Sequence, residues 1–535
     1  MTKINLITFS IYILLQLIKF TQSLADILFY IFYRKKNFSI KSTSKMHDNS
    51  QIIFEGNSIL DVQLAQFVAL NAFKAMSFNN FKYYNMSINF FYNPKKNFFY
   101  KNNNIFKINY NLSFGQIVKI LKLYKKIIKI KSKKKLANFK INKIKIGDLV
   151  YDSYLRFSKE PTIKFNDINF KIELFNSIST FIFWYEYFKN NNVDSLIQSH
   201  SNYRIGIPAR IALFTKIKVF IVNIDDVYRL DKNKKHIGLQ FLDYKKNFKR
   251  LNVIKFRKFT RNKMKIRFKG GKGFDIPHTF LHGFKNTKNI NNSLKFINKK
   301  NVLISCHDFT DSPNAYGNFI FNDFYEWVNY LGKFSKKFPD YDWYLKPHPN
   351  PVNNENKIIK NILDKYKNFK LIQANTPHTE IIKNISIVLT CRGTIGYEYP
   401  YFNIPVIMAS SLNKVTNYSF AYSARNINNY RKLLLNIPKI IQNYNAKKNE
   451  LEEFYFTHYY LYDASNWIIN DYQNFYNIKY KKNKIGSSKI SPSKILTTFR
   501  DFYKNEELIN DKSNIFVKFY KSNEYKLIFN NFYKT

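Results

Sequence analysis

The chain has 535 residues, 45% hydrophobic and 18% aromatic, which is enough for the cores of two or three domains and excludes a disordered tail protein. Its 87 Lys and Arg against 36 Asp and Glu give a formal charge of +51, a balance typical of partners such as nucleic acid or an anionic membrane. Because the lysines are spread along the chain with no zinc-finger spacing or concentrated basic arm, we expect no specific nucleic-acid partner. We still expect the positive charge to attract the protein to anionic lipid.

Residues 1–36 are apolar and aromatic and end in the basic run Arg34-Lys35-Lys36. Polar residues interrupt the apolar run, namely Gln16, Lys19, Gln22 and Asp26. The uninterrupted part is too short to span a bilayer, and no small-residue cleavage site follows it. We predict an amphipathic helix that lies on the membrane, with an ordinary buried helix and a true membrane span as alternatives.

Mixed α/β patterning over residues 50–230 predicts an N-terminal Rossmann-like lobe. Strands are predicted at "QIIFEG", "DSLIQ" and "KIKVFIV", and helices at 58–76, 114–130 and 176–190. Residues 231–298 are rich in Lys and Asn and are predicted to form an interdomain segment. The glycines of "FKGGKGF" at 268–274 do not sit in a strand–turn–helix unit, so we predict no phosphate loop there.

Regular alternation of strands and helices over residues 299–440 predicts a second α/β lobe. The predicted strands are "NVLISC", "DWYLK", "FKLIQ", "SIVLT" and "IPVIM", with helices near 321–336, 354–367, 376–384 and 394–402. Such alternation is typical of a parallel, doubly wound sheet. Residues 441–535 are predicted to be a helical C-terminal segment that packs across both domains or completes the second one.

Polar groups follow several predicted strands at the point where each strand ends. His307 follows the first strand of the second lobe, Lys346-Pro347-His348-Pro349 the next one, and Arg392-Gly393-Thr394 the strand "SIVLT". In the first lobe, "DSLIQ" is followed by His200. Since ligands of open parallel sheets bind at the carboxyl ends of the strands, these groups are candidates for one site.

The stretch "TCRGTIGYE" predicts a phosphate site at the start of a helix. Gly393 allows close approach of the backbone, Thr394 can cap the helix, and the first N–H groups then point at an anion. Glu398 is placed to accept hydrogen bonds from ribose, although a solvated surface Glu is the alternative, as is a plain cap with no ligand. His348 between two prolines is a rigid donor for a phosphate, or simply part of a stiff turn.

The motifs "WYLKPHPN" and "TCRGTIGYEYPYFNIPVI" resemble the donor-binding domain of GT-B glycosyltransferases that make bacterial surface carbohydrate. The resemblance is to capsule polysaccharide biosynthesis proteins, including Kdo-transferase-like and sialyltransferase-like relatives. It implies two Rossmann-like lobes of GT-B type with a central cleft, in which 50–230 is the acceptor lobe and 299–440 the nucleotide-binding lobe. It places the nucleotide phosphate on His348-Pro349 and Gly393-Thr394 and the ribose at Glu398, with Lys346, Arg392, His307 and Arg210 as further binding candidates.

The catalytic base does not follow from the resemblance, because no acidic-acidic-glycine motif of the sialyltransferase kind is present. Inverting transfer needs a group that takes the proton of the acceptor hydroxyl. Our candidates are Asp152 and Asp148 in "GDLVYDS", with His200 behind them. Asp148 could instead be a helix N-cap, and Asp152 could pair with Arg156 at i+4. No Asp-x-Asp motif lies near the rim, so we expect no metal and no cofactor other than the nucleotide-sugar donor.

Together these features favour a metal-independent glycosyltransferase that moves a sugar from a nucleotide-sugar donor to a capsule-like or lipopolysaccharide-like glycan. We expect it in the cytoplasm, peripheral at the anionic inner membrane and close to a lipid-linked acceptor. The two cysteines, Cys306 and Cys391, are too few for a disulfide framework and fit a reducing compartment. The alternatives are a CDP-polyol phosphotransferase of wall-teichoic-acid type, a basic protein that binds nucleic acid or membrane, and a GT-B scaffold without catalysis.

Overall fold

The structure is a computed structural model. It describes residues 48–56, 60–84, 105–224, 226–233, 235, 253–270, 284, 296, 300–315, 318–349, 351, 353, 355–461, 467–468 and 506–527. The helix predicted over residues 1–36 lies outside these ranges, as does most of the segment 231–298. Among the described helices, none has the length and apolar character needed to cross a membrane.

The first lobe is built on a six-stranded sheet in the order β3-β2-β1-β6-β7-β8. Its strands are β1 (Asp48–Glu55), β2 (Phe78–Tyr84), β3 (Phe106–Lys107), β6 (Val193–Gln198), β7 (Lys218–Val222) and β8 (Val227–Leu230). All neighbouring pairs are parallel except β7 and β8, which are antiparallel. When the six strands of this sheet are numbered along the chain, they lie side by side in the doubly wound order 3-2-1-4-5-6.

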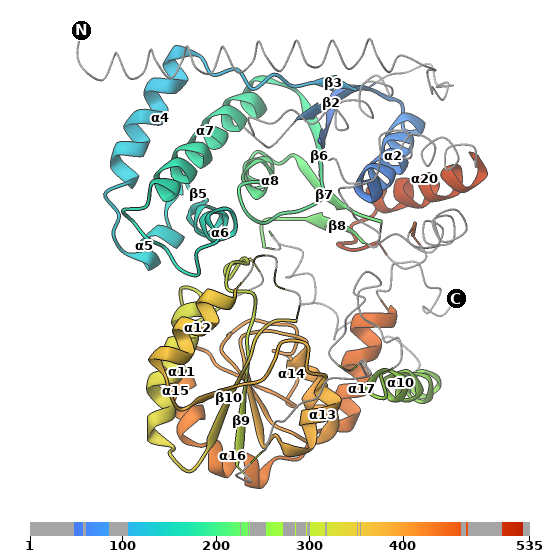
Figure 1. The fold of residues 1–535 in the computed structure, drawn as a ribbon. Coiled ribbons are helices and arrows are strands. Elements are labelled where there is room, and N and C mark those ends of the chain that lie inside the picture. Colours follow the sequence, from blue (N-terminus) through green and yellow to red (C-terminus); the bar gives the residue numbers. More distant parts are fainter. Residues whose placement is uncertain are drawn as a thin grey trace, which may run out of the picture.

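Helices cover both faces of this first sheet (Figure 1). They are α2 (Leu60–Ala75), α4 (Phe114–Ile127), α5 (Lys133–Ala137), α6 (Gly147–Ser158), α7 (Ile168–Asn190) and α8 (Gly206–Phe214). A small hairpin, β4 (Lys140–Ile141) with β5 (Ile144–Lys145), leads into α6. Helix α4 begins at a capping box in which Ser113 and Gln116 satisfy each other's backbone N–H groups. The aromatic helix α7 is packed core, as its sequence predicted.

The second lobe carries an all-parallel sheet in the order β11-β10-β9-β12-β13-β14. Its strands are β9 (Asn301–Ser305), β10 (Asp342–Lys346), β11 (Phe369–Leu371), β12 (Ile387–Thr390), β13 (Val406–Met408) and β14 (Tyr422–Ser423). This is again the order 3-2-1-4-5-6, so both lobes have the same doubly wound topology. The predicted α/β class with two Rossmann-like lobes of GT-B type is confirmed.

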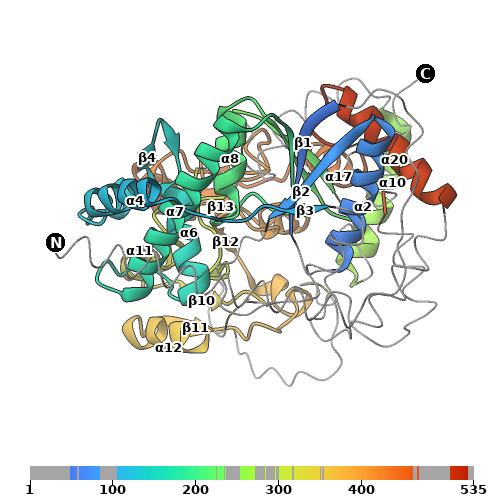
Figure 2. The same ribbon diagram turned by 90° about the horizontal axis from the view of Figure 1, so that it is seen from above.

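The second sheet is also covered on both faces (Figures 1 and 2). The helices are α11 (Phe324–Phe334), η2 (Ser335–Lys337), α12 (Asn356–Lys365), α13 (His378–Ile381), η3 (Ile382–Asn384), α14 (Ile395–Glu398), η4 (Tyr399–Phe402), α15 (Ile427–Leu435), α16 (Ile437–Asn443), α17 (Lys448–Phe456) and η5 (Thr457–Leu461). The four helical stretches predicted between the strands of this lobe are each found within one or two turns of their predicted bounds.

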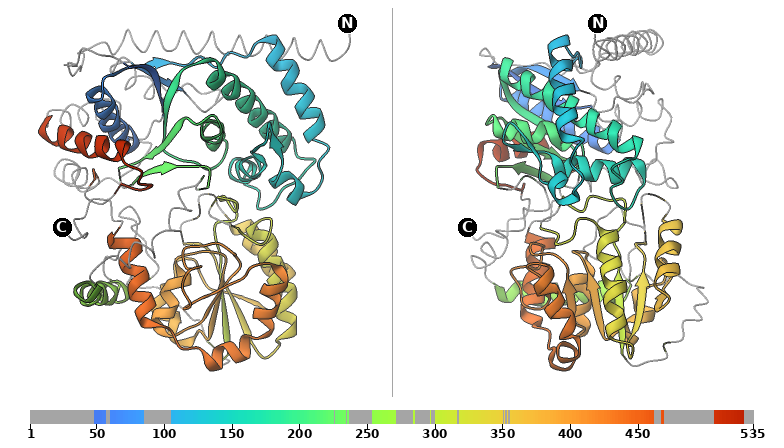
Figure 3. Two further views of the ribbon diagram at one scale, coloured as in Figure 1. Left: turned by 180° about the vertical axis from the view of Figure 1, so that it is seen from behind. Right: turned by 90° about the vertical axis from the view of Figure 1, so that its left-hand side faces the viewer.

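Two further helices pack against the lobes. The one in the segment 231–298 was not predicted, whereas the other falls in the segment 441–535 that was predicted to be helical. Helix α10 (Val253–Phe268) lies in the predicted interdomain segment and packs on α17, where Met264 and Phe268 join the core of the second lobe. Helix α20 (Glu506–Lys521) returns to the first lobe, where Phe516 and Tyr520 pack on Phe73 of α2 (Figures 1 and 3). The chain therefore crosses between the lobes a second time near its C-terminal end.

Candidate active site

The strand order reverses between β9 and β12, and this switch point brings His307 and Arg392 together. The backbone N–H of Arg392 donates to Nε2 of His307 at 3.2 Å. Because Nε2 accepts, the proton of the neutral ring sits on Nδ1, which becomes a donor. Burial, and then the positive charges of Arg392 and His348, lower the pKa of His307 to about 3. His307 is thus a neutral hydrogen-bond donor at the position where doubly wound sheets bind ligands.

His348 follows β10, the neighbour of β9, and so lies beside His307. A positive charge on His348 disfavours protonation of His307, and so lowers its pKa. Pro347 and His348 are half-buried and Pro349 is exposed. The loop that carries His348 is tied back to the end of β9, since Asn353 donates through Nδ2 to Oγ1 of Thr310 at 2.8 Å. The structure therefore brings together the two histidines that the sequence placed at separate strand ends.

The guanidinium of Arg392 shapes the loop that follows β9. It donates to the backbone carbonyls of Ser312 at 2.6 Å and Pro313 at 3.2 Å. Its carbon lies 5.5 Å from the centre of the Phe324 ring, and the His307 ring stacks on the same ring at 4.8 Å. Arg392 thus combines a structural bond to the loop with a positive charge beside the two histidines.

The start of α14 differs in detail from the predicted capped helix. Thr394 is exposed and its side chain makes no capping hydrogen bond, so that part of the prediction is wrong. The reason is its helical backbone, φ −56° and ψ −29°, whereas a capping side chain projects from an extended residue. A Cβ at Gly393 would lie 3.6 Å from His307, which is ordinary contact. Gly393 and Thr394 nevertheless stand at the rim next to His307, with the first intrahelical bond made by Gly396.

Two of the predicted binding residues are buried and paired inside the second lobe. Glu398 forms an ion pair at 2.5 Å with Arg267 of α10, and neither side chain is exposed. Lys346 is 4% exposed and donates to the carbonyls of Ala374 at 2.8 Å and Gln373 at 3.3 Å. Burial lowers the pKa of Lys346 to about 8. Glu398 therefore holds α10, and Lys346 holds the segment after β11. The alternative in which Glu398 is a solvated surface residue is wrong.

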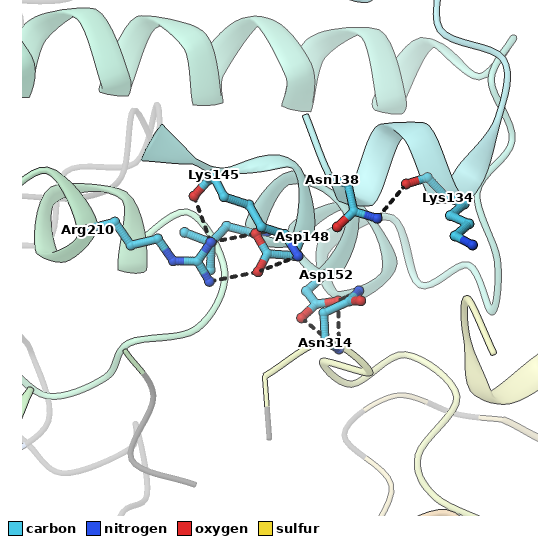
Figure 4. Close-up of polar contacts among 8 residues, drawn as sticks. Lys134, Asn138, Lys145, Asp148, Asp152, Arg210 and Asn314 are labelled. Atoms are coloured by element: carbon cyan, nitrogen blue, oxygen red, sulfur yellow. Dashed lines mark hydrogen bonds and ion pairs between the residues drawn. The ribbon is translucent and has the colours of Figure 1, made fainter. Parts of the chain in front are cut away.

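Asp152 of α6 lies against the second lobe, where Asn314 hydrogen-bonds to its carboxylate. Asn314 donates through Nδ2 at 2.7 Å and through its backbone N–H at 3.3 Å (Figure 4). Asp152 is 1% exposed, and burial raises its pKa well above the usual range, while Asn314 and Arg392 counteract that rise. The alternative pairing with Arg156 is not formed, because that guanidinium lies over the Tyr203 ring at 5.6 Å. Asp152 thus has a pKa raised by burial and lies close enough to Arg392 for the guanidinium charge to lower that pKa in part.

Asp148 and Arg210, predicted for catalysis and binding, instead form a buried ion pair with each other. Arg210 donates through Nη1 and Nη2 to the two carboxylate oxygens at 2.5 and 2.8 Å, and also to the carbonyl of Lys145 (Figure 4). Asp148 is not the N-cap of α6, since Ile146 takes that position. Because both carboxylate oxygens are occupied, we assign this pair to joining α6 and α8.

His200 lies at the switch point of the first sheet, between the ends of β1 and β6. Glu55 of β1 accepts hydrogen bonds there from the N–H of Ser199 at 2.7 Å and from its hydroxyl at 2.9 Å. Nδ1 of His200 accepts from the N–H groups of Ser201 and Asn202. Burial lowers its pKa, so the ring is neutral and carries its proton on Nε2. In this arrangement Nε2 of His200 is a donor and cannot serve as a base.

Polar contacts that the sequence reasoning missed join the two lobes around this site. Asp323, the N-cap of α11, accepts from Tyr151 at 2.5 Å and Thr162 at 2.6 Å, and lies 3.6 Å from Lys133. Tyr203 donates to Asp311, and Asn202 donates to Ser312 at 3.2 Å. These second-lobe partners lie in 311–323, shortly after His307, and Lys133 also pairs with Glu326 of α11 at 2.5 Å. The only signal in the sequence was the polar stretch "CHDFTDSP", whose partners are more than a hundred residues away.

The described residues contain no group of three or more His, Cys, Asp or Glu arranged to hold a metal ion. Cys306 and Cys391 are free and buried, and burial raises the pKa of both thiols, so neither resembles a reactive cysteine.

Fold and site together define a two-lobed α/β protein of GT-B type whose polar groups converge between the switch points of its two sheets. Neither the protein-family models nor the sequences of curated proteins yield a match to the chain. Solved structures that resemble it include KpsC of Thermosulfurimonas dismutans, a β-Kdo 2,4 transferase, with 10% identity, 50% of this chain and 81% of that chain covered, and a TM-score of 0.32.

A second KpsC structure from the same organism, a β-Kdo 2,7 transferase, has 12% identity, covers 49% of this chain and 74% of that one, and has a TM-score of 0.29. The UDP-GlcNAc 2-epimerase of Neisseria meningitidis, bound to UDP-GlcNAc, has 12% identity, 76% and 97% coverage, and a TM-score of 0.24. The resemblance predicted from the motifs, to GT-B proteins that include capsule Kdo transferases, is found here as a likeness of fold at low identity.

Proposed function

We propose that the protein is a glycosyltransferase that moves a sugar from a nucleotide-sugar donor to a surface glycan of capsule or lipopolysaccharide type. The observation that carries the proposal is the meeting of His307 and Arg392 across the switch point of the second sheet, with His348 beside them. A neutral N–H donor, a second imidazole and a guanidinium at one strand rim form a site for a diphosphate or a phosphate monoester.

The same groups suit the departure of a nucleotide. When the bond between the anomeric carbon and the phosphate oxygen breaks, negative charge grows on that oxygen. Nδ1–H of His307 and the ring of His348 can donate to it, and the charge of Arg392 stabilises it. We propose that these groups serve the leaving phosphate without a metal ion. Turnover that survives a chelator would support this part of the proposal, and turnover restored only by added Mg²⁺ or Mn²⁺ would contradict it.

Asp152 is the residue that we propose as the general base. Its carboxylate belongs to the first lobe and faces the second, and its raised pKa makes the ionised form a stronger base, able to take a proton from the acceptor hydroxyl above that pKa. For this transfer the hydroxyl must replace Asn314 on the carboxylate. Asp148 and His200 are less suitable, the first because of Arg210 and the second because Nδ1 already accepts hydrogen bonds.

We further propose that the lipid-linked acceptor is reached at the anionic inner membrane, from the cytoplasmic side. Support comes from 113–147, which contains no Asp or Glu and spans α4, α5 and the β4–β5 hairpin at the outer edge of the first lobe (Figures 1 and 3). Its exposed lysines are Lys119, Lys122, Lys125, Lys126, Lys129, Lys131, Lys134, Lys135, Lys140 and Lys143. Such a surface attracts anionic lipid head groups. Salt-sensitive co-sedimentation with phosphatidylglycerol vesicles, absent with phosphatidylcholine, would support this contact.

The test of the proposed function is product formation from a donor panel. The full chain is incubated with CMP-, UDP-, GDP- and TDP-sugars, and separately with CDP-glycerol, together with a crude bacterial lipid-linked glycan fraction. We expect release of free nucleotide and a mass increase of one sugar from one of the sugar nucleotides, and neither with Asp152→Asn. Transfer of glycerol phosphate from CDP-glycerol would instead show a polyol phosphotransferase. Tight, salt-sensitive nucleic-acid binding without any turnover would favour a basic binding protein.

A further inference from the structure

A buried carboxyl pair lies beneath the loop that carries His348. The loop runs from the end of β10 to Glu355, the residue directly before α12. Glu355 is 4% exposed, and Asp308, the residue after His307, is 5% exposed. The pair therefore connects the two strand ends that present the candidate phosphate ligands His307 and His348.

Glu355 accepts a hydrogen bond from the segment that follows β9, and Asp308 accepts two within that same segment. Oε1 of Glu355 accepts from the N–H of Phe309 at 2.5 Å. Asp308 accepts from the N–H and the hydroxyl of Thr310, both at 2.8 Å. Oε2 of Glu355 is buried and receives no hydrogen bond from the N–H and O–H groups of the described residues, while its carboxyl lies within hydrogen-bonding reach of Asp308.

Two carboxylates cannot both stay ionised in this setting, because burial and mutual repulsion disfavour the second charge. A proton between them removes one charge and supplies the donor that Oε2 lacks. In agreement, burial and then Asp308 raise the pKa of Glu355 to about 9. Among the described residues, the thiol of Cys306 also faces Glu355; it is buried and neutral, and Lys346 acts on it.

We propose that Glu355 is protonated on Oε2 and donates a hydrogen bond from there to Asp308. Through this bond it fixes the loop that presents His348 to the donor phosphate. The inference rests on the proposed function for its last step alone. Together with the bond from Asn353 to Thr310, the carboxyl pair joins the end of the loop that precedes α12 to the residues that follow β9. Glu355 is thus a positioning residue that acts through His348.

Stability against pH tests the shared proton without any ligand. Between about pH 5 and about pH 9 the folded wild type holds a proton on Glu355 that the unfolded chain has released, so raising the pH disfavours the fold. Glu355→Gln keeps an N–H donor toward Asp308 and an acceptor for Phe309 but cannot titrate. The ratio of the unfolding equilibrium constants of wild type and Glu355→Gln should therefore change by up to about tenfold per pH unit in this window. Equal pH profiles would overturn the proposal.

Nucleotide binding tests the positioning role. With the nucleotide that most raises the melting temperature of the wild type, Glu355→Ala should lose most of that shift and Glu355→Gln should keep it. If Glu355→Ala fails to fold, Asp308→Asn takes its place in the test. Its side chain can donate to Glu355 in the reverse direction, so it should keep most of the shift in melting temperature. In a His348→Ala background the Glu355 substitution should have no further effect, and an additive loss would contradict an action through His348. If no nucleotide stabilises the wild type, the proposed function fails, whereas the shared proton is still decided by the pH profiles.

Discussion

The backbone N–H of Arg392 donates to Nε2 of His307 at 3.2 Å, and this bond joins the ends of two strands, β9 and β12, that are more than eighty residues apart in the chain. It fixes the tautomer of His307, and with it the direction in which this histidine can donate. The candidate site is therefore defined by backbone geometry at the switch point as much as by the side chains themselves.

Replacing His307 by Ala should weaken nucleotide binding roughly tenfold, because one donor to the phosphate and one acceptor for the Arg392 N–H are lost. Since the pKa of His307 is about 3, its contribution should stay the same between about pH 5 and about pH 8. Calorimetric titration of wild type and His307→Ala at both pH values measures this. A difference between the two proteins that vanishes at the higher pH would show that His307 acts as a cation.

Asp152→Asn should abolish sugar transfer and leave nucleotide binding intact. The same substitution should make stability less dependent on pH. The pKa of Asp152 is raised by burial, so above the pKa of the unfolded chain the native protein holds a proton that the unfolded chain has lost, and stability falls as the pH rises. Urea unfolding of both proteins across the acidic to neutral range checks this. A wild type whose stability rises more steeply with pH than that of the variant would contradict it.

Arg210→Met should lower the free energy of unfolding by about 3–5 kcal/mol, because it leaves Asp148 buried without its bidentate partner. The matched control is Lys367→Ala, which breaks an exposed pair with Asp364 and should change stability by less than about 0.5 kcal/mol. Chemical denaturation measures both. If Arg210→Met instead stays as stable as wild type and loses nucleotide binding, the original prediction of Arg210 as a ligand contact was right.

Asp323→Ala should loosen the junction between the lobes. It removes the acceptor shared by Tyr151 and Thr162 and leaves both hydroxyl groups without it at the interface, at a cost of about 2–3 kcal/mol. Limited proteolysis of the segment between the lobes should become faster, and the melting temperature should fall as well, because Asp323 also caps α11. Asp323→Asn, which retains one acceptor oxygen, should have a smaller effect. Unchanged proteolysis in Asp323→Ala would show that these contacts do not hold the lobes together.

The fold was predictable because the period of the apolar pattern and the spacing of the strands can be read from short stretches of the sequence. The five strands predicted in the second lobe are all present. Helix α10 was missed because its sequence, residues 253–268, is basic and weakly amphipathic, and its apolar contacts come from the distant helix α17.

The site was predictable only in part. Strand ends identified His307, His348 and Arg392, since the doubly wound order brings such residues together. The partners of Asp148, Lys346 and Glu398 were not predictable, because burial and pairing depend on Arg210, on the carbonyls after β11 and on α10. A charged residue near a strand end has the same local pattern whether it faces a ligand or a buried partner.

The central claim is that the rim of His307, His348 and Arg392 binds the phosphate of a nucleotide. The most direct measurement is calorimetric titration of CMP, UDP, GDP and TDP into wild type, His348→Ala and, as a control for folding and surface charge, Lys367→Ala. We predict that one nucleotide binds wild type and Lys367→Ala alike and that His348→Ala loses at least about tenfold in affinity, the equivalent of one charge-assisted hydrogen bond. Equal affinity in wild type and His348→Ala, or no binding of any nucleotide to the wild type, would contradict the account.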